Sequence, residues 1–294
     1  MRTTRCRTAL RPGVLPLVAP VVLVVLLLAP AIGRENTAHC TDVATVSNTV
    51  ASGAEDAVDA ETVSDPGAPD ADDLLGRYDD LYDSSGTVAT VEIVITTPKK
   101  TRTMEMRFWA KGEEKALMVV DAPARDAGTA TLKVDKNLWN YLPKISRTIR
   151  VPPSMMMGAW MGSDLTNDDI VRDSSYRDDY EAEYVVWSDE PEGWKVRMKA
   201  NEEAVGLWNA VEMVFAEDDG LPLMAQFYDR KDRLSRTMTF DEVEVVGDRR
   251  IPMHIVIVPE REEGRSTEFR YIDVEFDVNV PDDTFSLSRL ERMN

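Results

Sequence analysis

The sequence predicts a mainly β protein that folds as one large, curved antiparallel sheet or partial barrel. From residue 87 onward, apolar and polar residues alternate in short runs, and turn residues such as Gly and Asp separate these runs. Alternation with a period of two and one solvated face is typical of antiparallel strands. A meander of about eleven strands must curl or close, because large flat sheets are rare and their edges promote aggregation.

Residues 1–33 predict a secretory signal peptide. Residues 1–13 hold four Arg and no acid, the stretch Val14–Ile32 is almost wholly apolar, and small residues occur around Pro30. This is the order of a charged region, an apolar region and a small-residue cleavage site. An uncleaved anchor helix is the alternative, since the stretch is just long enough to span a membrane, although three Pro interrupt it.

Residues 34–69 predict a disordered acidic leader. The segment is rich in Ala, Ser, Thr, Asp and Glu, lacks aromatic residues, and has no Lys or Arg after Arg34. Such a composition buries too little apolar surface to offset the entropy lost on ordering. We therefore expect the folded domain at residues 70–294, which is long enough for one sizeable core.

The domain is expected to open with a short amphipathic helix, because Leu74, Leu75, Tyr78, Leu81 and Tyr82 recur near helical spacing. Alternating runs follow, and Gly or Asp marks most of the turns between them. The candidate strands lie near residues 87–97, 101–110, 114–121, 128–135, 137–142, 145–150, 180–188, 193–200, 208–217, 221–230, 234–245, 249–259 and 266–278.

Residues 152–175 interrupt the strand pattern with a Met-rich insertion. Thr166 and Asp169 have the spacing of a capping box, which predicts a short helix. Methionine is flexible and polarizable and is common at adaptable apolar binding surfaces. A segment crossing the concave face of a curved sheet could act as a lid; that its apolar residues simply fill the open end of the barrel stays an equal alternative. These residues are Met155, Met156, Met157, Trp160 and Met161.

Charge and residue types argue against several function classes. The formal net charge of −19 disfavours nucleic acid and anionic lipid surfaces, which reward Lys and Arg. Both Cys lie before residue 41 and His254 is the sole His of the expected domain. The chain has no G-x-x-x-x-G-K-[ST] or G-x-G-x-x-G motif. We therefore predict a non-enzymatic protein without catalytic residues, metal or cofactor; an enzyme acting on lipids or glycans is the weaker alternative.

Several short motifs follow one another along the chain in a characteristic order. The stretch "LWNYLPK" at 138–144 follows a P-x-x-x-x-G-T pattern, "MGSDLTNDDI" occupies 161–170, and "VPDDTFSLSRLER" ends the domain. Together they resemble the outer membrane lipoprotein-sorting protein family, relatives of the periplasmic lipoprotein carrier LolA. The resemblance implies a single unclosed antiparallel β-barrel with short helices covering its hydrophobic concave face.

The same resemblance implies a periplasmic carrier that binds acyl chains of lipoproteins or other lipids and transfers them between the inner and outer membranes. Its expected partners are an inner-membrane transporter and an outer-membrane acceptor. An envelope sensor, or an accessory protein of an inner-membrane lipid exporter, is the alternative on the same fold. The candidate lipid-binding residues are the five of the Met-rich insertion together with Trp139, Tyr141, Met104, Met106 and Phe108.

Overall fold

The computed structural model describes residues 64–171, 176–201 and 208–292. The predicted signal peptide and residues 34–63 of the predicted leader lie outside the described residues. Within the described residues, no helix is both long and apolar enough to cross a membrane.

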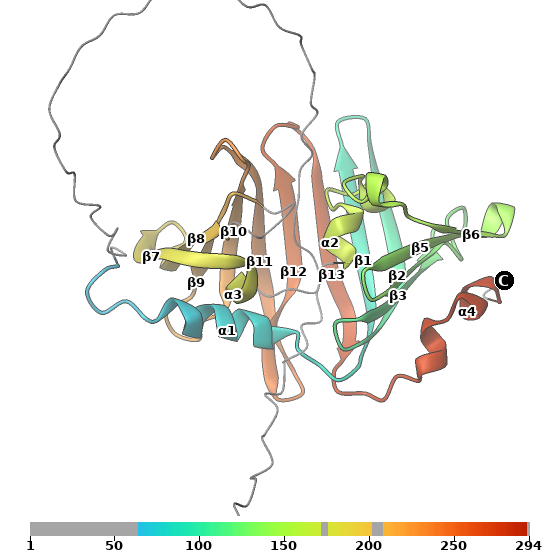
Figure 1. Ribbon diagram of the computed structural model, residues 1–294, viewed down its shortest axis with the longest axis horizontal. Helices are drawn as coiled ribbons and strands as arrows, with labels where there is room; N and C mark the ends of the chain where they lie inside the picture. The colour runs from blue at the N-terminus through green and yellow to red at the C-terminus, as the bar shows by residue number, and fades with distance from the viewer. Residues whose placement is uncertain (1–63, 172–175, 202–207, 293–294) are drawn as a thin grey trace, which may run out of the picture.

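In the described part of the chain, thirteen strands form one antiparallel sheet that is not closed, in agreement with the predicted fold class (Figure 1). The number of strands is higher than the expected eleven, and each of the candidate ranges overlaps a strand. The strands are β1 Thr87–Thr97, β2 Lys100–Lys111, β3 Lys115–Ala122, β4 Ala130–Val134, β5 Asn137–Leu142, β6 Arg147–Arg150, β7 Tyr180–Asp189, β8 Glu192–Ala200, β9 Ala210–Phe215, β10 Pro222–Tyr228, β11 Leu234–Val246, β12 Arg249–Pro259 and β13 Ser266–Glu275.

Short helices accompany the sheet. The longest, α1, begins after Asp70, whose carboxylate accepts a hydrogen bond from the Asp72 amide at 2.8 Å. Asp72 and Asp73 in its first turn also favour a helix start, because they complement the helix dipole. The helices are α1 Ala71–Leu81, α2 Asn167–Val171, α3 Tyr176–Asp179, α4 Leu287–Glu291 and the 3₁₀ turns η1 Pro143–Ile145, η2 Pro153–Met155, η3 Trp160–Gly162 and η4 Asp282–Phe285.

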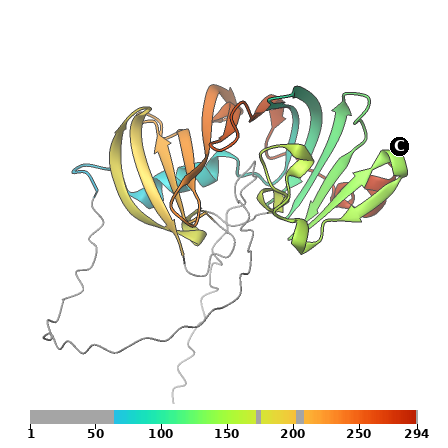
Figure 2. The ribbon, with the colours of Figure 1, turned by 90° about the horizontal axis from the view of Figure 1, so that it is seen from above.

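The strand order places the first and last strands side by side at the centre of the sheet. It reads β6-β5-β4-β3-β2-β1-β13-β12-β11-β10-β9-β8-β7, so β1 pairs with β13. The two edge strands, β6 and β7, are consecutive in sequence but do not pair. The connection between them leaves one edge of the sheet and returns at the other. Figure 2 shows the sheet as two curled halves.

Each face of the sheet carries its own hydrophobic cluster. The larger cluster lines the concave face, where α1 covers the half from β7 to β12; the Tyr78 ring meets the Phe240 ring edge-on at 6.2 Å. The smaller cluster lies on the opposite face of β3–β5, where the C-terminal segment packs Phe285 and Leu290 against Leu117 and Leu132. The concave face of the remaining half, from β13 to β5, is left to the connection between the edge strands.

Candidate functional site

Residues 151–171 form a lid over the concave face of β13 and β1–β5. Inside the lid, the Trp160 amide donates to the Leu165 carbonyl at 2.7 Å, and the Asn167 amide donates to the Gly158 carbonyl at 2.9 Å. Between Trp160 and Leu165 the chain reverses its direction at Met161 and Gly162, whose φ angles are 52° and 80°. The lid is therefore a tight hairpin with its own hydrogen bonds.

The predicted capping box is confirmed at the start of α2. The Thr166 amide donates to the Asp169 carboxylate at 2.7 Å, and the Asp169 amide donates to Thr166 Oγ1 at 3.1 Å. The Asn167 side-chain amide donates to the carbonyls of Met155 and Gly158 at 3.0 and 3.2 Å. The Met-rich turn is thus fixed to the helix that follows it.

Polar side chains attach the lid to the sheet. Thr267 Oγ1 of β13 donates to the Asp164 carboxylate at 2.6 Å, and the Arg265 guanidinium pairs with the same carboxylate. On another strand, Arg236 Nη1 lies 3.3 Å from Asp169 Oδ2, and both side chains are buried. The Trp160 indole N–H donates to Thr131 Oγ1 of β4 at 3.1 Å. These contacts hold the lid at three separate strands.

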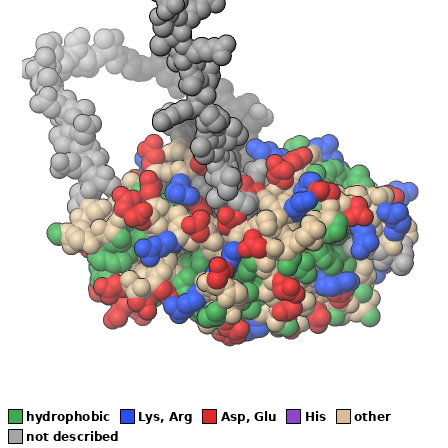
Figure 3. All heavy atoms as spheres, turned by 90° about the horizontal axis from the view of Figure 1, so that it is seen from below, with side chains coloured by type: hydrophobic (Ala, Val, Ile, Leu, Met, Phe, Trp, Pro, Cys, Tyr) green, Lys and Arg blue, Asp and Glu red, His purple; other side chains and the backbone are tan. Residues whose placement is uncertain are grey.

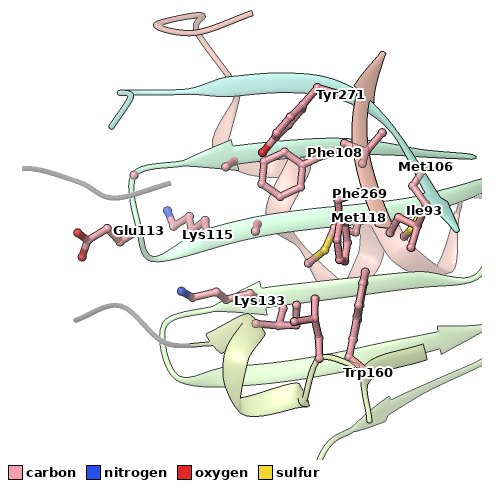
Figure 4. A pocket seen from close by; sticks show the side chains of 16 residues that line it. Ile93, Met106, Phe108, Glu113, Lys115, Met118, Lys133, Trp160, Phe269 and Tyr271 are labelled. Carbon is pink, nitrogen blue, oxygen red and sulfur yellow. The ribbon is translucent and has the colours of Figure 1, made fainter. Parts of the chain in front are cut away.

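A narrow apolar cavity lies beneath the lid (Figure 4). One wall is the concave face of β13 and β1–β4, and the other is formed by Trp160, Leu165 and Ile170 of the lid. The cavity volume is about 60 Å³. The lining side chains from the sheet include Val91, Ile93, Met106, Phe108, Ala110, Ala116, Met118, Phe269 and Tyr271.

Charged side chains mark one end of this cavity, at the turn from β2 to β3. Glu113, Lys115 and Lys133 lie there, and Figure 4 shows them away from the end where Trp160 and Phe269 meet. Lys115 Nζ bonds Asp282 at 2.7 Å, whereas Lys133 is a buried residue on the concave side of β4. The cavity is therefore polar at one end and apolar along its length.

Several sequence-predicted residues meet at this cavity. Met106, Phe108 and Trp160 line it, and Met104 is buried in the same concave cluster. The partly buried Met156, Met157 and Met161 pack against that cluster from the lid. Met155, in contrast, is 59% exposed and forms no part of the lining.

Trp139 and Tyr141 do not reach the cavity. Both belong to the smaller cluster on the opposite face of the sheet. Because side chains alternate along β5, Leu138 faces the concave cluster instead. Their predicted role in lining the cavity is therefore not carried further.

Sequence reasoning missed part of the lid and all of its attachment points on β11 and β13. Leu165 and Ile170 lie within "MGSDLTNDDI", directly before and after the capping box of Thr166 and Asp169, so the positions of a hydrophobic staple were an available signal. Arg236 and Thr267 are separated from the lid by more than sixty residues of sequence, and no local pattern indicates their contacts.

His254 lies on the convex side of β12, away from the cavity. Its Nδ1 is 2.8 Å from Asp241 Oδ1, and its Nε2 is 3.5 Å from Glu268 Oε2. Glu242, the third member of this His and carboxylate cluster, pairs with Arg270. The side chains of this cluster contact one another and Arg270, and none of the three lines the cavity.

Comparisons with known proteins place this fold. No curated protein matches the chain. A DUF1329 family protein from Desulfovibrio piger has a TM-score of 0.66 at 24% identity, covering 74% of this chain and 96% of that one. An outer membrane lipoprotein-sorting protein domain from Vibrio parahaemolyticus has a TM-score of 0.61 at 22% identity, covering 71% and 92%.

A LolA superfamily protein from Nitrosomonas europaea has a TM-score of 0.62 at 20% identity, covering 76% of this chain and all of that one. The resemblance that the motifs indicate is thus confirmed for the fold. A family model described as that of an uncharacterized protein matches residues 112–292, more than half of the chain. The chain belongs to the family that this model describes, and its fold is that of LolA-like lipoprotein-sorting proteins.

Proposed function

We propose that this protein is a periplasmic carrier that binds an acyl chain of a lipid or lipoprotein beneath the lid. The observation that carries the proposal is the cavity between Trp160, Leu165 and Ile170 on the lid and the apolar concave face of the sheet. An acyl chain would lie along the apolar walls, with its polar head at the charged end near Lys133. Exchange with an inner-membrane transporter and an outer-membrane acceptor completes the proposed path.

The size of the cavity requires the lid to move. Ligand pockets commonly have volumes of about 300–1,000 Å³, whereas this cavity has about 60 Å³. The structure therefore corresponds to a closed form, in which an entire acyl chain does not fit. Displacing the hairpin of Met161 and Gly162 would open the concave face without breaking any pairing within the sheet.

Energetics favour such a movable lid. Each buried methylene contributes about 0.8 kcal/mol, so one acyl chain gains roughly 10 kcal/mol on leaving water for either a protein or a bilayer. A carrier must match the bilayer closely, or the cargo would not be released. A lid held to the sheet by a few hydrogen bonds, each worth about 1 kcal/mol net, and by the ion pairs of Asp164 and Asp169, of which the buried pair with Arg236 adds little net stability, can close over the chain and open again without a nucleotide.

A reversible cross-link tests the proposal directly. Asp164 Oδ2 and Thr267 Oγ1 are 2.6 Å apart, so Asp164→Cys with Thr267→Cys should form a lid-to-sheet disulfide when Cys6 and Cys40 are replaced by Ser. We expect the oxidised protein to take up a fluorescent fatty acid at least tenfold more slowly than the reduced protein. The measurement is the rate of fluorescence increase after mixing.

The matched controls are the two single Cys variants in the same background, in which oxidant should change nothing. Equal uptake rates for the oxidised and reduced double variant, with the disulfide verified by mass, would remove the lid from the binding path.

A further inference from the structure

The segment from β5 to the start of the lid differs in charge from the rest of the chain. The whole sequence has 53 Asp and Glu against 34 Lys and Arg. Residues 136–163 contain no acid at all, yet Lys144, Arg147 and Arg150 fall there. An acid-free stretch of this length in so acidic a chain singles out the β6 end of the sheet.

Apolar side chains are exposed in the same place. Ile145 is 57% exposed and Met155 is 59% exposed, and Leu142 and Ile149 are also open to solvent. The pairing register puts Ile149 opposite Asn140 and Arg147 opposite Leu142, so these side chains share the concave side of the β5–β6 ladder. We call Leu142, Lys144, Ile145, Arg147, Ile149 and Met155 the edge patch.

The cations of the edge patch are not neutralised. Elsewhere many Arg side chains form ion pairs, as Arg197 does with Glu183 and Glu212. Within the described part of the chain, Lys144 and Arg147 form no ion pair with any carboxylate. Their charge is therefore available to a partner. In Figure 3, the right-hand side of the molecule, where β6 lies in Figure 1, carries basic, hydrophobic and acidic side chains next to one another.

A shallow groove of about 490 Å³ connects the edge patch to the lid. Leu142, Ile145 and Met161 supply apolar lining, and Arg125 and Lys144 supply positive charge. Among the described residues that line the groove, Asp126 alone carries a carboxylate, and this group is shared between Arg125 and Arg102. The groove thus offers cations and aliphatic side chains together.

We propose that the edge patch docks the protein on an anionic phospholipid surface. Unpaired cations attract lipid phosphates, and exposed Ile and Met side chains insert at the boundary between headgroups and acyl chains. Because Met161 belongs to both the groove and the lid, docking here would bring the lid to the membrane. Docking itself does not depend on the carrier function, although its purpose in cargo exchange rests on the proposed function.

The overall negative charge does not prevent this local contact. At physiological ionic strength, charges separated by more than about 8 Å are largely screened. Acids on the distant half of the sheet therefore repel the lipid headgroups only weakly, compared with the attraction of cations that touch these headgroups. Added salt should weaken the docking, because a higher ionic strength shortens the distance over which the cations attract the lipid phosphates.

Vesicle co-sedimentation tests the proposal. The sample is the full chain, expressed in and purified from its native host. The probes are vesicles of phosphatidylglycerol with phosphatidylethanolamine, compared with vesicles of phosphatidylcholine alone. We expect Lys144→Glu with Arg147→Glu, and separately Ile145→Ser with Ile149→Ser, to weaken binding to the anionic vesicles roughly tenfold or more. The charge-matched control is Arg230→Glu with Lys231→Glu at the β10–β11 turn, and the apolar control is Val245→Ser; both should bind as the wild type does.

Fatty-acid uptake from solution, measured on the same variants, separates the two proposals. Unchanged uptake with weakened vesicle binding supports the edge patch and shows that the variants are folded. If a charge reversal lowers uptake as well, the neutral pair Lys144→Gln with Arg147→Gln replaces it. Wild-type binding that is equal on both kinds of vesicle, or that survives both patch variants, overturns the docking proposal and leaves the carrier proposal intact.

Discussion

Arg236 of β11 and Asp169 of α2 form a buried ion pair between the sheet and the lid, with Nη1 and Oδ2 3.3 Å apart. The Arg236 guanidinium also lies 4.8 Å from the centre of the Phe227 ring and 5.3 Å from that of Trp208. It therefore links the half of the sheet that α1 covers to the lid that covers the other half. A buried pair of this kind contributes little net stability but is costly to break on one side only.

Arg236→Met should loosen the lid. Met retains the apolar stem against Phe227 but leaves the Asp169 carboxylate buried without its cation, which typically costs about 3–5 kcal/mol. Part of this cost is relieved if the lid opens, so we expect faster uptake and faster release of a fluorescent fatty acid. Stopped-flow fluorescence measures both rates.

The matched control adds Asp169→Asn to Arg236→Met. The amide removes the stranded charge and keeps an oxygen to accept from the Thr166 amide. Exchange should therefore slow again toward the wild-type rate. Identical exchange rates for the single and double variants would show that the buried charge does not govern the lid.

Ala110→Leu should fill the cavity and block binding. Ala110 is almost fully buried and lines the cavity between β2 and the lid. The added carbons would occupy part of the 60 Å³, so urea denaturation should show stability unchanged or raised by about 1 kcal/mol, since each buried methylene contributes about 0.8 kcal/mol less any strain. Fatty-acid affinity should fall at least tenfold in equilibrium titration.

Met118→Leu is the control for Ala110→Leu, because it changes shape at the same wall with little change in volume. It should retain affinity within a few-fold. Equal affinities for wild type and Ala110→Leu would place the acyl chain elsewhere on the protein.

The strands were predictable because the alternation of apolar and polar residues that indicates a strand lies within a short stretch of sequence. Met104, Met106 and Phe108 alternate with polar residues, and all three are buried on the concave face. The capping box of Thr166 and Asp169 was equally readable, since both partners lie within one helical turn. Local patterns were therefore sufficient to predict the approximate positions of the strands and of the lid helix.

Contacts between distant segments were not predictable in this way. Trp139 alternates as regularly as Met104, but alternation cannot say which face of a strand meets the larger cluster. The β1–β13 pairing joins residues 170 to 187 positions apart, and the Arg236 contact to the lid depends on that arrangement. The residues that build the site could therefore be brought together only once the three-dimensional fold was known.

Stability should depend on pH through Asp79 of α1. Burial raises the pKa of Asp79 to about 6, and the Arg177 guanidinium, 3.0 Å away, opposes part of the rise. The folded state therefore binds this proton more tightly than the unfolded state does. Its stabilising contribution is complete below the usual carboxyl pKa near 4 and is lost as pH rises through about 6.

Asp79→Asn should remove this dependence, because an amide resembles the protonated carboxyl. Relative to wild type, the variant should gain stability between about pH 4 and pH 7 in urea denaturation. Asp73→Asn, an exposed change on the same helix, controls for the loss of one negative charge. A constant difference between Asp79→Asn and wild type across this range would contradict the assigned cause.

Residues 64 and 65 should protect the β7 edge of the sheet. The Asp65 amide donates to the Val185 carbonyl at 2.9 Å, the Trp187 amide donates to the Asp65 carboxylate at 2.7 Å, and the Val185 amide donates to Ser64 Oγ at 3.0 Å. Without them these backbone groups of an edge strand would be free to pair with another chain. A chain that begins at Gly67 should therefore self-associate more than one that begins at Ser64, as measured by light scattering after size-exclusion chromatography. Both should take up fatty acid as the complete protein does, because β7 lies at the far edge of the sheet from the cavity, and equal masses for the two truncated chains would show that the β7 edge needs no cover.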